Sequence, residues 1–325
     1  MQVSKARRLA ASLGLSVAVT LCGCSFVLDR ADDAYVRMSG TLVPRIEQGL
    51  KHPGELTVGI RREAQIPFVL ESRGHASGLD VEVGAALANE MGLPVSFVYV
   101  DDVLDALGHT CDCVMEVDTQ EALGFEVLNP YMYSAVAIFR VGEPGIVSAS
   151  DLEGSVIAVQ EGSASEAVLD STALTVTKLP VASLGDGFAA LAAGQCNYCL
   201  GHAMPGSYLA RTMDNVSFAG TLTDPTALSI AVPGGDDPVS AQLRSSLEVL
   251  STNGVLNETL RRWLGDTYAM VRDSRVADVP MPVVESVELE VIGAVDGDGT
   301  SAGSNAVTVS ASYGSAYGED EGYYY

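Results

Sequence analysis

Cysteine is the residue type in this sequence whose spacing could support redox or metal chemistry. Cys196 and Cys199 have the Cys-x-x-Cys spacing of redox proteins, but that chemistry needs the pair at a helix N-terminus. Here the pair stands at the start of an apolar run that predicts a strand. Cys111 and Cys113 alternate around Asp112, so they share one face of a strand, and a direct bridge between them would be strained. All four are predicted to be buried thiols or members of one or two structural disulfides.

A metal or cofactor site is not indicated by the remaining motifs. His109 and His202 could join the cysteines around zinc, but no tight two-plus-two spacing supports such a site. No nucleophile elbow, phosphate-binding loop or metal-binding motif is present in the sequence. We therefore predict that the protein has no cofactor and no metal.

The amino terminus has the three parts of an export signal. Lys5, Arg7 and Arg8 precede an uncharged apolar stretch from Leu9 to Leu21. This stretch is shorter than the roughly 20 residues that a stable membrane-spanning helix needs. Residues 1–23 are therefore predicted to be a signal peptide that is removed.

The end of this signal resembles the lipobox of bacterial lipoproteins. In Leu21-Cys22-Gly23-Cys24 the resemblance implies that Cys24 carries the lipid and becomes the first residue of the mature chain. The alternative is an ordinary signal peptide with an incidental cysteine. If Cys24 carries the lipid, residues 24–53 form a lipid-anchored tether that holds the protein on the outer, extracytoplasmic face of the cell membrane.

Charge and composition exclude some classes of partner. The chain of 325 residues has 18 Lys and Arg against 42 Asp and Glu, a net charge of −24, which becomes −27 without Lys5, Arg7 and Arg8. Such a surface does not fit nucleic acid or anionic lipid. With 47% hydrophobic and 18% charged residues the chain is predicted to be globular, with room for two or three domains.

Short strands and helices alternate through the middle of the chain. Strand patterns are followed by helical ones, which predicts α/β layers with largely parallel sheets. The segments 107–114 and 193–200 repeat one arrangement, a helix end, a turn and a strand, so two similar units are expected. After Tyr268 there are two Arg against ten acidic residues, followed by Gly, Ser and Tyr, and we predict that residues 267–325 are a disordered tail.

Several motifs in this order resemble a known family, the extracytoplasmic solute-binding proteins of polar amino acid ABC transporters, bacterial family 3. The resemblance covers 54–266 and rests on these segments: Leu56–Ile60, Pro67-Phe68, Gly78–Val83, Leu87–Gly92, Asn129–Tyr133, Asp151–Gly154, Val156–Ser163, Asn253–Leu256 and Arg262–Gly265. It implies a two-lobed periplasmic-binding-protein fold of type II. The first lobe would comprise 54–139 and 229–266, and the second 140–228.

The resemblance implies that the lobes enclose a small polar solute and deliver it to ABC permease subunits, with the binding protein acting as a monomer. Phe68 would be an apolar wall, while Gly162 and Ser163 match a family loop that donates hydrogen bonds. Asp80 would either face the cleft or cap the helix beside it.

Two positions depart from the family pattern. Glu121 stands where the family has an Arg that clamps the ligand carboxylate, and His202 stands where it has an Asp for the ammonium group. Either the site has reversed its charges to suit an amine, or it has drifted toward a peptide-like or uncharged solute, or no ligand. Other hypotheses are a sensory or surface-interaction lipoprotein and, less favoured, a dehydratase-like enzyme using Glu121, Glu161 and His202. We expect a binding protein and not an enzyme.

Overall fold

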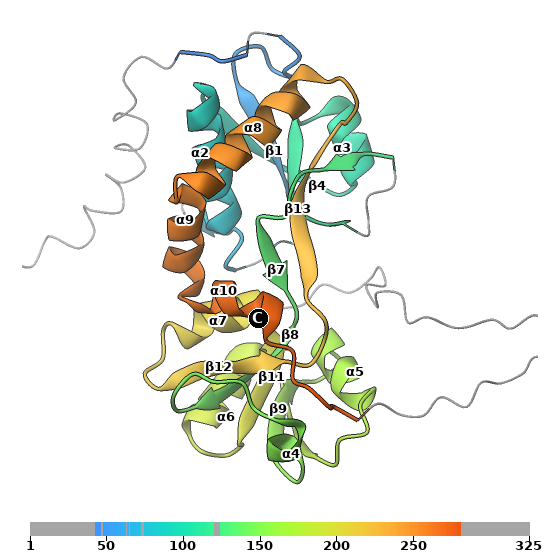
Figure 1. The fold of residues 1–325 in the computed structure, drawn as a ribbon, viewed down its shortest axis with the longest axis vertical. Coiled ribbons are helices and arrows are strands. Elements are labelled where there is room, and N and C mark those ends of the chain that lie inside the picture. The colour runs from blue at the N-terminus through green and yellow to red at the C-terminus, as the bar shows by residue number, and fades with distance from the viewer. Residues whose placement is uncertain are drawn as a thin grey trace, which may run out of the picture.

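Two α/β lobes lie end to end along the long axis of the molecule (Figure 1). The computed structural model describes residues 43–46, 48–62, 64, 66–72, 75–119 and 124–280. The α/β fold with two sheets flanked by helices is confirmed. The predicted signal peptide, Cys24 and most of the tether lie outside the described residues.

The first lobe contains both early and late parts of the chain. Its elements are β1 (Leu56–Arg61), β2 (Leu70–Ser72), β3 (His75–Ser77), α2 (Leu79–Met91), β4 (Val95–Val100), α3 (Val103–His109), β5 (Cys113–Asp118), β6 (Glu126–Val127), β7 (Met132–Ser134), β13 (Thr226–Val232), α8 (Pro238–Thr252) and α9 (Val255–Leu264). The strand order of its main sheet is β4-β1-β5-β13-β6, and β7 also pairs with β13.

The second lobe is formed by the intervening chain and a short C-terminal piece. Its elements are β8 (Val136–Val141), α4 (Ala149–Leu152), β9 (Val156–Gln160), α5 (Ala164–Asp170), β10 (Thr177–Val181), α6 (Leu184–Ala192), β11 (Tyr198–His202), α7 (Ala203–Ala210), β12 (Val216–Thr221), α10 (Thr267–Met270) and the 3₁₀ helix η2 (Val271–Asp273). The strand order is β10-β9-β11-β8-β12.

Both sheets are mixed, not largely parallel. In the first, β1 is parallel to β4 and β5, whereas β13 is antiparallel to β5, β6 and β7. In the second, β9 is parallel to β10 and β11, whereas β8 is antiparallel to β11 and β12. The antiparallel strands β8 and β13 are those that continue directly from the other lobe, so they enter each sheet without a crossover helix.

Side-chain caps fix where many of the helices begin. Asp102, Ser148, Ser163, Ser183 and Asp237 each accept a hydrogen bond from the backbone N–H three residues further on. This is the preferred chemistry of an N-cap, because it satisfies one of the first backbone N–H groups of the helix.

The chain passes between the lobes earlier than the sequence indicated. All of β8 pairs within the second sheet, so the first passage lies at Ala135, before the expected boundary after Phe139. The return passage lies at 222–225, because Thr226 to Leu228 already pair with β7 in the first lobe. The apolar run Ala135–Phe139 contains no break in composition that could have located the change of sheet.

Residues 267–280 correct the prediction of a disordered tail that starts at 267. They form α10 and η2 and then bind along the second lobe, where Thr221 N–H donates to Ser274 O and Val276 N–H donates to Thr221 O. Val271 and Val276 are buried in the second lobe. The prediction used the average composition of 267–325, which is acidic, and so did not detect these two apolar contacts. Residues 281–325 lie outside the described residues.

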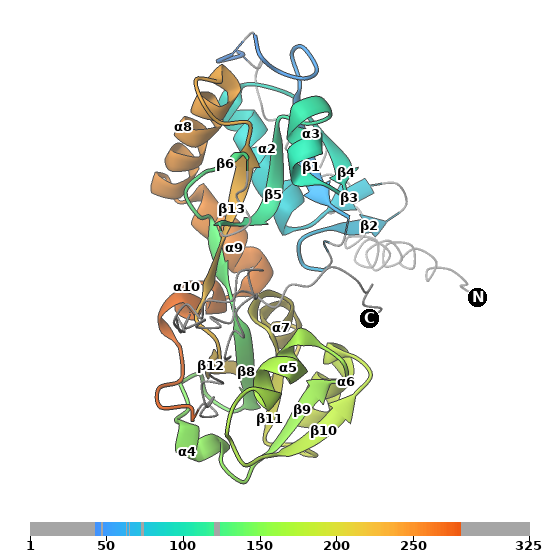
Figure 2. The ribbon, with the colours of Figure 1, turned by 90° about the vertical axis from the view of Figure 1, so that its right-hand side faces the viewer.

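The core of the second lobe packs closely around Phe139 of β8. Its ring centroid lies 5.1 Å from that of Phe188 and 6.1 Å from that of Phe218. Helix α7 covers this ring, because a Cβ added to Gly206 would lie 2.3 Å from Phe139 Cε2. Figure 2 shows α7 between β8 and the first lobe.

Gly206→Ala is expected to destabilise the protein by about 1–3 kcal/mol, because the added methyl group overpacks a core that contains a fully buried ring. The control is Gly185→Ala in α6, where the new Cβ would meet only Ser183 Oγ at 3.6 Å. Removing a helical glycine there should stabilise by up to about 1 kcal/mol. Denaturant unfolding of both variants checks this, and a stabilised Gly206→Ala would contradict the packing argument.

Candidate functional site

The predicted site residues of the second lobe gather at one edge of its sheet. Because β9, β10 and β11 are parallel, their carboxyl ends meet at the same edge. Gly162 and Ser163 follow β9, and His202 ends β11 directly before α7. The structure therefore brings these three residues to one edge, at the start of two helices.

Ser163 is the N-cap of α5. Its hydroxyl donates to Gln160 O over 2.7 Å and accepts from Glu166 N–H over 3.1 Å. The hydroxyl proton of Ser163, which the family resemblance implies is donated to a ligand, is therefore donated to the backbone at Gln160 O. Gly162 precedes the cap with φ 73°, a left-handed conformation that glycine adopts without strain.

Glu166 places a carboxylate at this helix start, a contact that the sequence analysis missed. Its Oε2 accepts from Gly162 N–H over 2.7 Å, and its Oε1 lies 2.9 Å from Lys178 Nζ. The hydrogen bond from Lys178 and that from Gly162 N–H lower the pKa of Glu166, so the group is ionised at neutral pH. The Ser-x-x-Glu spacing of 163–166 is a capping-box pattern and could have revealed this arrangement.

His202 is half-buried and is the N-cap residue of α7, without a side-chain cap hydrogen bond. Burial lowers the pKa of its imidazole, which keeps the ring neutral at pH 7. It pairs with Val136, next to the passage between the lobes.

In the first lobe, Phe68 and Asp80 are brought together by the backbone. Asp80 N–H donates to Phe68 O over 3.1 Å, and Gly78 between them has φ 137°. A Cβ on Gly78 would lie 2.2 Å from Phe68 O, so only glycine allows this approach. Phe68 is 7% exposed and packs in the core of the first lobe, which leaves little of its ring for a ligand.

Asp80 is fully buried and does not cap α2, whose N-cap is Gly78. Its Oδ1 accepts from the hydroxyl of Tyr131 over 2.8 Å, and its Oδ2 has no hydrogen-bond partner among the described residues. Burial raises the pKa of this carboxyl to about 7, although the Tyr131 hydroxyl favours the charged form. Tyr131 directly precedes β7, so this bond links α2 to the segment that leads into the second lobe.

Glu121, the residue that replaces the family arginine, lies outside the described residues. Of the predicted site residues that the structure describes, Gly162, Ser163 and His202 lie at one edge of the second sheet. Phe68 and Asp80 lie next to each other in the first lobe. Glu161, an acid–base candidate of the enzyme hypothesis, directly precedes Gly162 and is exposed. Its backbone N–H donates to Val181 O.

The four cysteines within the described residues are buried, unpaired thiols. Burial raises the pKa of Cys111 to about 12 and that of Cys199 to about 12, so neither thiol is a nucleophile at neutral pH. Within the described part of the chain, no three or more His, Cys, Asp or Glu residues are grouped so that they could hold a metal ion.

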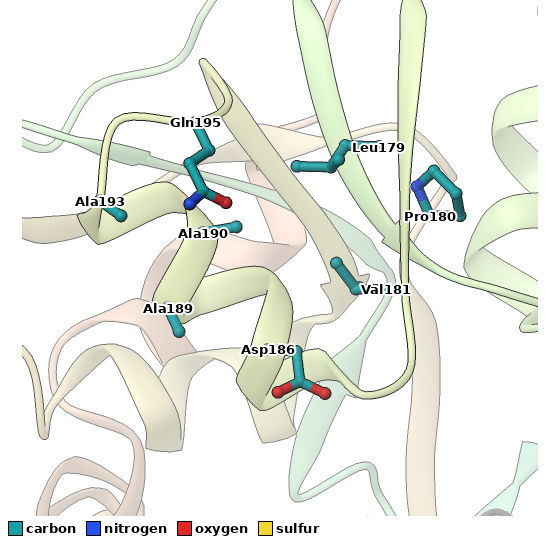
Figure 3. A pocket seen from close by; sticks show the side chains of 8 residues that line it. All are labelled: Leu179, Pro180, Val181, Asp186, Ala189, Ala190, Ala193 and Gln195. Carbon is teal, nitrogen blue, oxygen red and sulfur yellow. The ribbon is translucent and has the colours of Figure 1, made fainter.

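A groove of about 490 Å³ lies elsewhere, between β10 and α6 (Figure 3). Its apolar lining consists of Leu179, Pro180, Val181, Ala189, Ala190 and Ala193, and its polar lining of Asp186 and Gln195. We call it the β10–α6 groove. None of the predicted site residues lines it.

Within the residues that the structure describes, no helix combines the length and the apolar character needed to cross a membrane.

Two lobes joined by short passages, with helix starts at strand carboxyl ends, define the class of two-lobed solute-binding proteins. The family model described as "Bacterial extracellular solute-binding proteins, family 3" matches residues 56–266. The chain belongs to this family, as the sequence motifs predicted.

Solved structures with the same fold agree. They include the L-cystine solute receptor of Neisseria gonorrhoeae in the unliganded open conformation, with 20% identity, 66% of this chain and 94% of that chain covered, and a TM-score of 0.57. The second substrate-binding domain of GlnP from Lactococcus lactis has 19% identity, coverage of 69% and 98%, and a TM-score of 0.55. An ancestral cationic amino acid solute-binding protein has 22% identity, coverage of 65% and 96%, and a TM-score of 0.55.

Asp80→Asn is expected to make stability less dependent on pH. Because the folded pKa of about 7 exceeds the ordinary value of 3.8, the contribution of Asp80 to stability is greatest below about pH 4 and is lost as pH rises through 7. At about 1.4 kcal/mol per pKa unit, the free energy of unfolding of the Asn variant relative to that of the wild type should rise over this range by at most about 4 kcal/mol. Urea unfolding from pH 4 to pH 8 measures it.

Tyr131→Phe is the control for this prediction, because it removes the hydroxyl that favours the carboxylate. It should lower stability more at pH 8 than at pH 5. If the free energy of unfolding of Asp80→Asn differed from that of the wild type by the same amount at every pH, the raised pKa of Asp80 would be contradicted.

Proposed function

We propose that this family member is an extracytoplasmic lipoprotein that captures a small polar solute between its lobes and delivers it to an ABC importer. The observation that carries the proposal is the match of 56–266 to the solute-binding family on a fold of two α/β lobes. Short passages at Ala135 and 222–225 suit rotation of one lobe against the other around a bound solute.

Membrane anchoring is part of the same proposal and is supported by the sequence at the amino terminus. Cys24 carries the lipid, and residues 24–53 separate the first lobe from the membrane surface. The protein acts as a monomer that presents its bound solute to permease subunits.

The ligand is proposed to be amino-acid-like or an amine, and its carboxylate, if it has one, is not held at the start of α5. Glu166 already accepts the hydrogen bond of Gly162 N–H there, and a ligand carboxylate would meet this like charge. Glu121 adds a further acidic group in place of an arginine. His202 is neutral at pH 7 and so does not repel a cation.

Thermal unfolding of the full chain against amino acids, polyamines, quaternary amines and short peptides tests the proposal. A ligand that binds only the folded state at 100 times its Kd adds about 2.7 kcal/mol. For a protein of this size that corresponds to a rise in Tm of roughly 5–10 °C. We expect the rise with cationic amines, and its loss in Glu121→Gln.

The matched control is Glu248→Gln, which removes the same charge from an exposed position on α8. It should leave the rise in Tm unchanged. A rise with ordinary amino acids that persists in Glu121→Gln would show that the site assignment is wrong. No rise with any compound would argue for a sensory or surface-interaction lipoprotein, and chemical conversion of a compound would argue for an enzyme.

A further inference from the structure

The β10–α6 groove lies at a free sheet edge. β10 is the outermost strand of the second sheet, and the described part of the chain provides no strand on its other side. Thr177 N–H donates to Ser155 O, and Val181 O accepts from Glu161 N–H, so alternate residues of β10 pair with β9. Lys178 and Pro180 therefore direct their backbone groups toward the free side. Lys178 offers one N–H and one C=O there, and Pro180 offers a C=O.

The two faces of this edge differ in chemistry. Lys178 Nζ lies 2.9 Å from both Glu166 and Asp170 of α5, which puts its side chain on the α5 face. Since side chains alternate along a strand, Leu179 and Val181 point to the opposite face, where both are half-buried beside α6. A strand added to this edge would find an apolar groove on the α6 side.

The described chain ends beside the beginning of β10. Ala173, a few residues before this strand, donates its N–H to Pro280 O over 2.6 Å. Val279 packs on the same apolar cluster as Leu174 and Val176, which lead into β10. Residue 281 therefore follows from a point beside the residues that lead into β10.

The sequence that follows has the pattern of a strand with one apolar face. Val287, Leu289 and Val291 alternate with Glu288 and Glu290, a period of two. Five residues in this pattern reach about 16 Å, enough to span a strand as short as β10. Such a segment has one face to bury and one face suited to water.

We propose that residues 287–291 bind along the free edge of β10, with Val287, Leu289 and Val291 in the β10–α6 groove and Glu288 and Glu290 toward solvent. The added strand runs parallel to β10 because it enters at the beginning of that strand. It pairs with the free N–H and C=O of Lys178. In doing so it covers an edge that otherwise invites association with other chains.

Amide hydrogen exchange of Lys178 in the full chain tests this assignment, because that N–H is the group the added strand would protect. We expect Lys178 to exchange slowly in the wild type. It should exchange at least about tenfold faster when Val287, Leu289 and Val291 are all changed to Asn. The matched control, Glu288→Gln with Glu290→Gln, alters only the solvent face and should keep the protection. Ala189→Arg, at an exposed position of α6 that lines the groove, should abolish protection like the triple variant.

Protection at Leu200 in the central strand β11 shows whether each variant is folded, so loss at Lys178 alone is informative. Fast exchange of Lys178 in the wild type would overturn the proposal. Equal protection in the wild type and the Asn triple variant would overturn it as well. Protection that disappears on dilution would show instead that a second copy occupies the groove.

Discussion

The arrangement of the whole molecule depends on two segments that change sheets at its middle. One leaves β7, which pairs with β13 in the first lobe, and becomes β8 of the second; the other returns from β12 to β13. At the crossing they bind each other, since Val136 N–H donates to Thr223 Oγ1 and Leu222 N–H donates to Val136 O. Any rotation of the lobes has to be absorbed at these few residues and at 265–266, where α9 leads into α10, because the paired strands on either side are held by their sheets.

A second connection runs through the helices and reaches the proposed site. The ring of Tyr208 on α7 stacks on that of Trp263 on α9, with centroids 6.0 Å apart. Since α7 begins directly after His202, one short helix joins the site edge of the second lobe to a helix of the first. The apolar core is likewise continuous between the lobes, with Phe139 and Leu264 in a single cluster. The site edge of the second lobe is therefore connected to the first lobe through α7 as well as through the two passages.

The sequence predicts most of the regular elements because their local patterns are strong. The ends of the strand Val95–Val100 and of the helices Pro238–Thr252 and Val255–Leu264 are marked in the sequence by a proline start, a cap or a glycine stop. The α/β class follows from their alternation. The short strand β7, by contrast, has too few residues to produce a period and is recognised only from its pairing with β13.

The site is less predictable than the fold because its contacts join residues that are distant in sequence. Asp80 was expected to face a ligand or cap a helix, whereas its partner is Tyr131, 51 residues further on. No spacing rule relates these two positions, and their bond exists only because α2 and the segment before β7 pack together. Ser163 and Glu166 differ in this respect, because their contact is local and the Ser-x-x-Glu pattern contains it.

Taken together, these contacts limit the chemistry of the proposed ligand. A helix start at a strand end offers backbone N–H groups to an anion, and in this protein Glu166 accepts one of them at Gly162. A ligand carboxylate could take that place only by displacing an ionised side chain that also pairs with Lys178. A cationic or neutral group requires no such displacement, and beside the neutral His202 it meets no positive charge. Under the proposed function, the second lobe would therefore face the end of a solute that carries no negative charge.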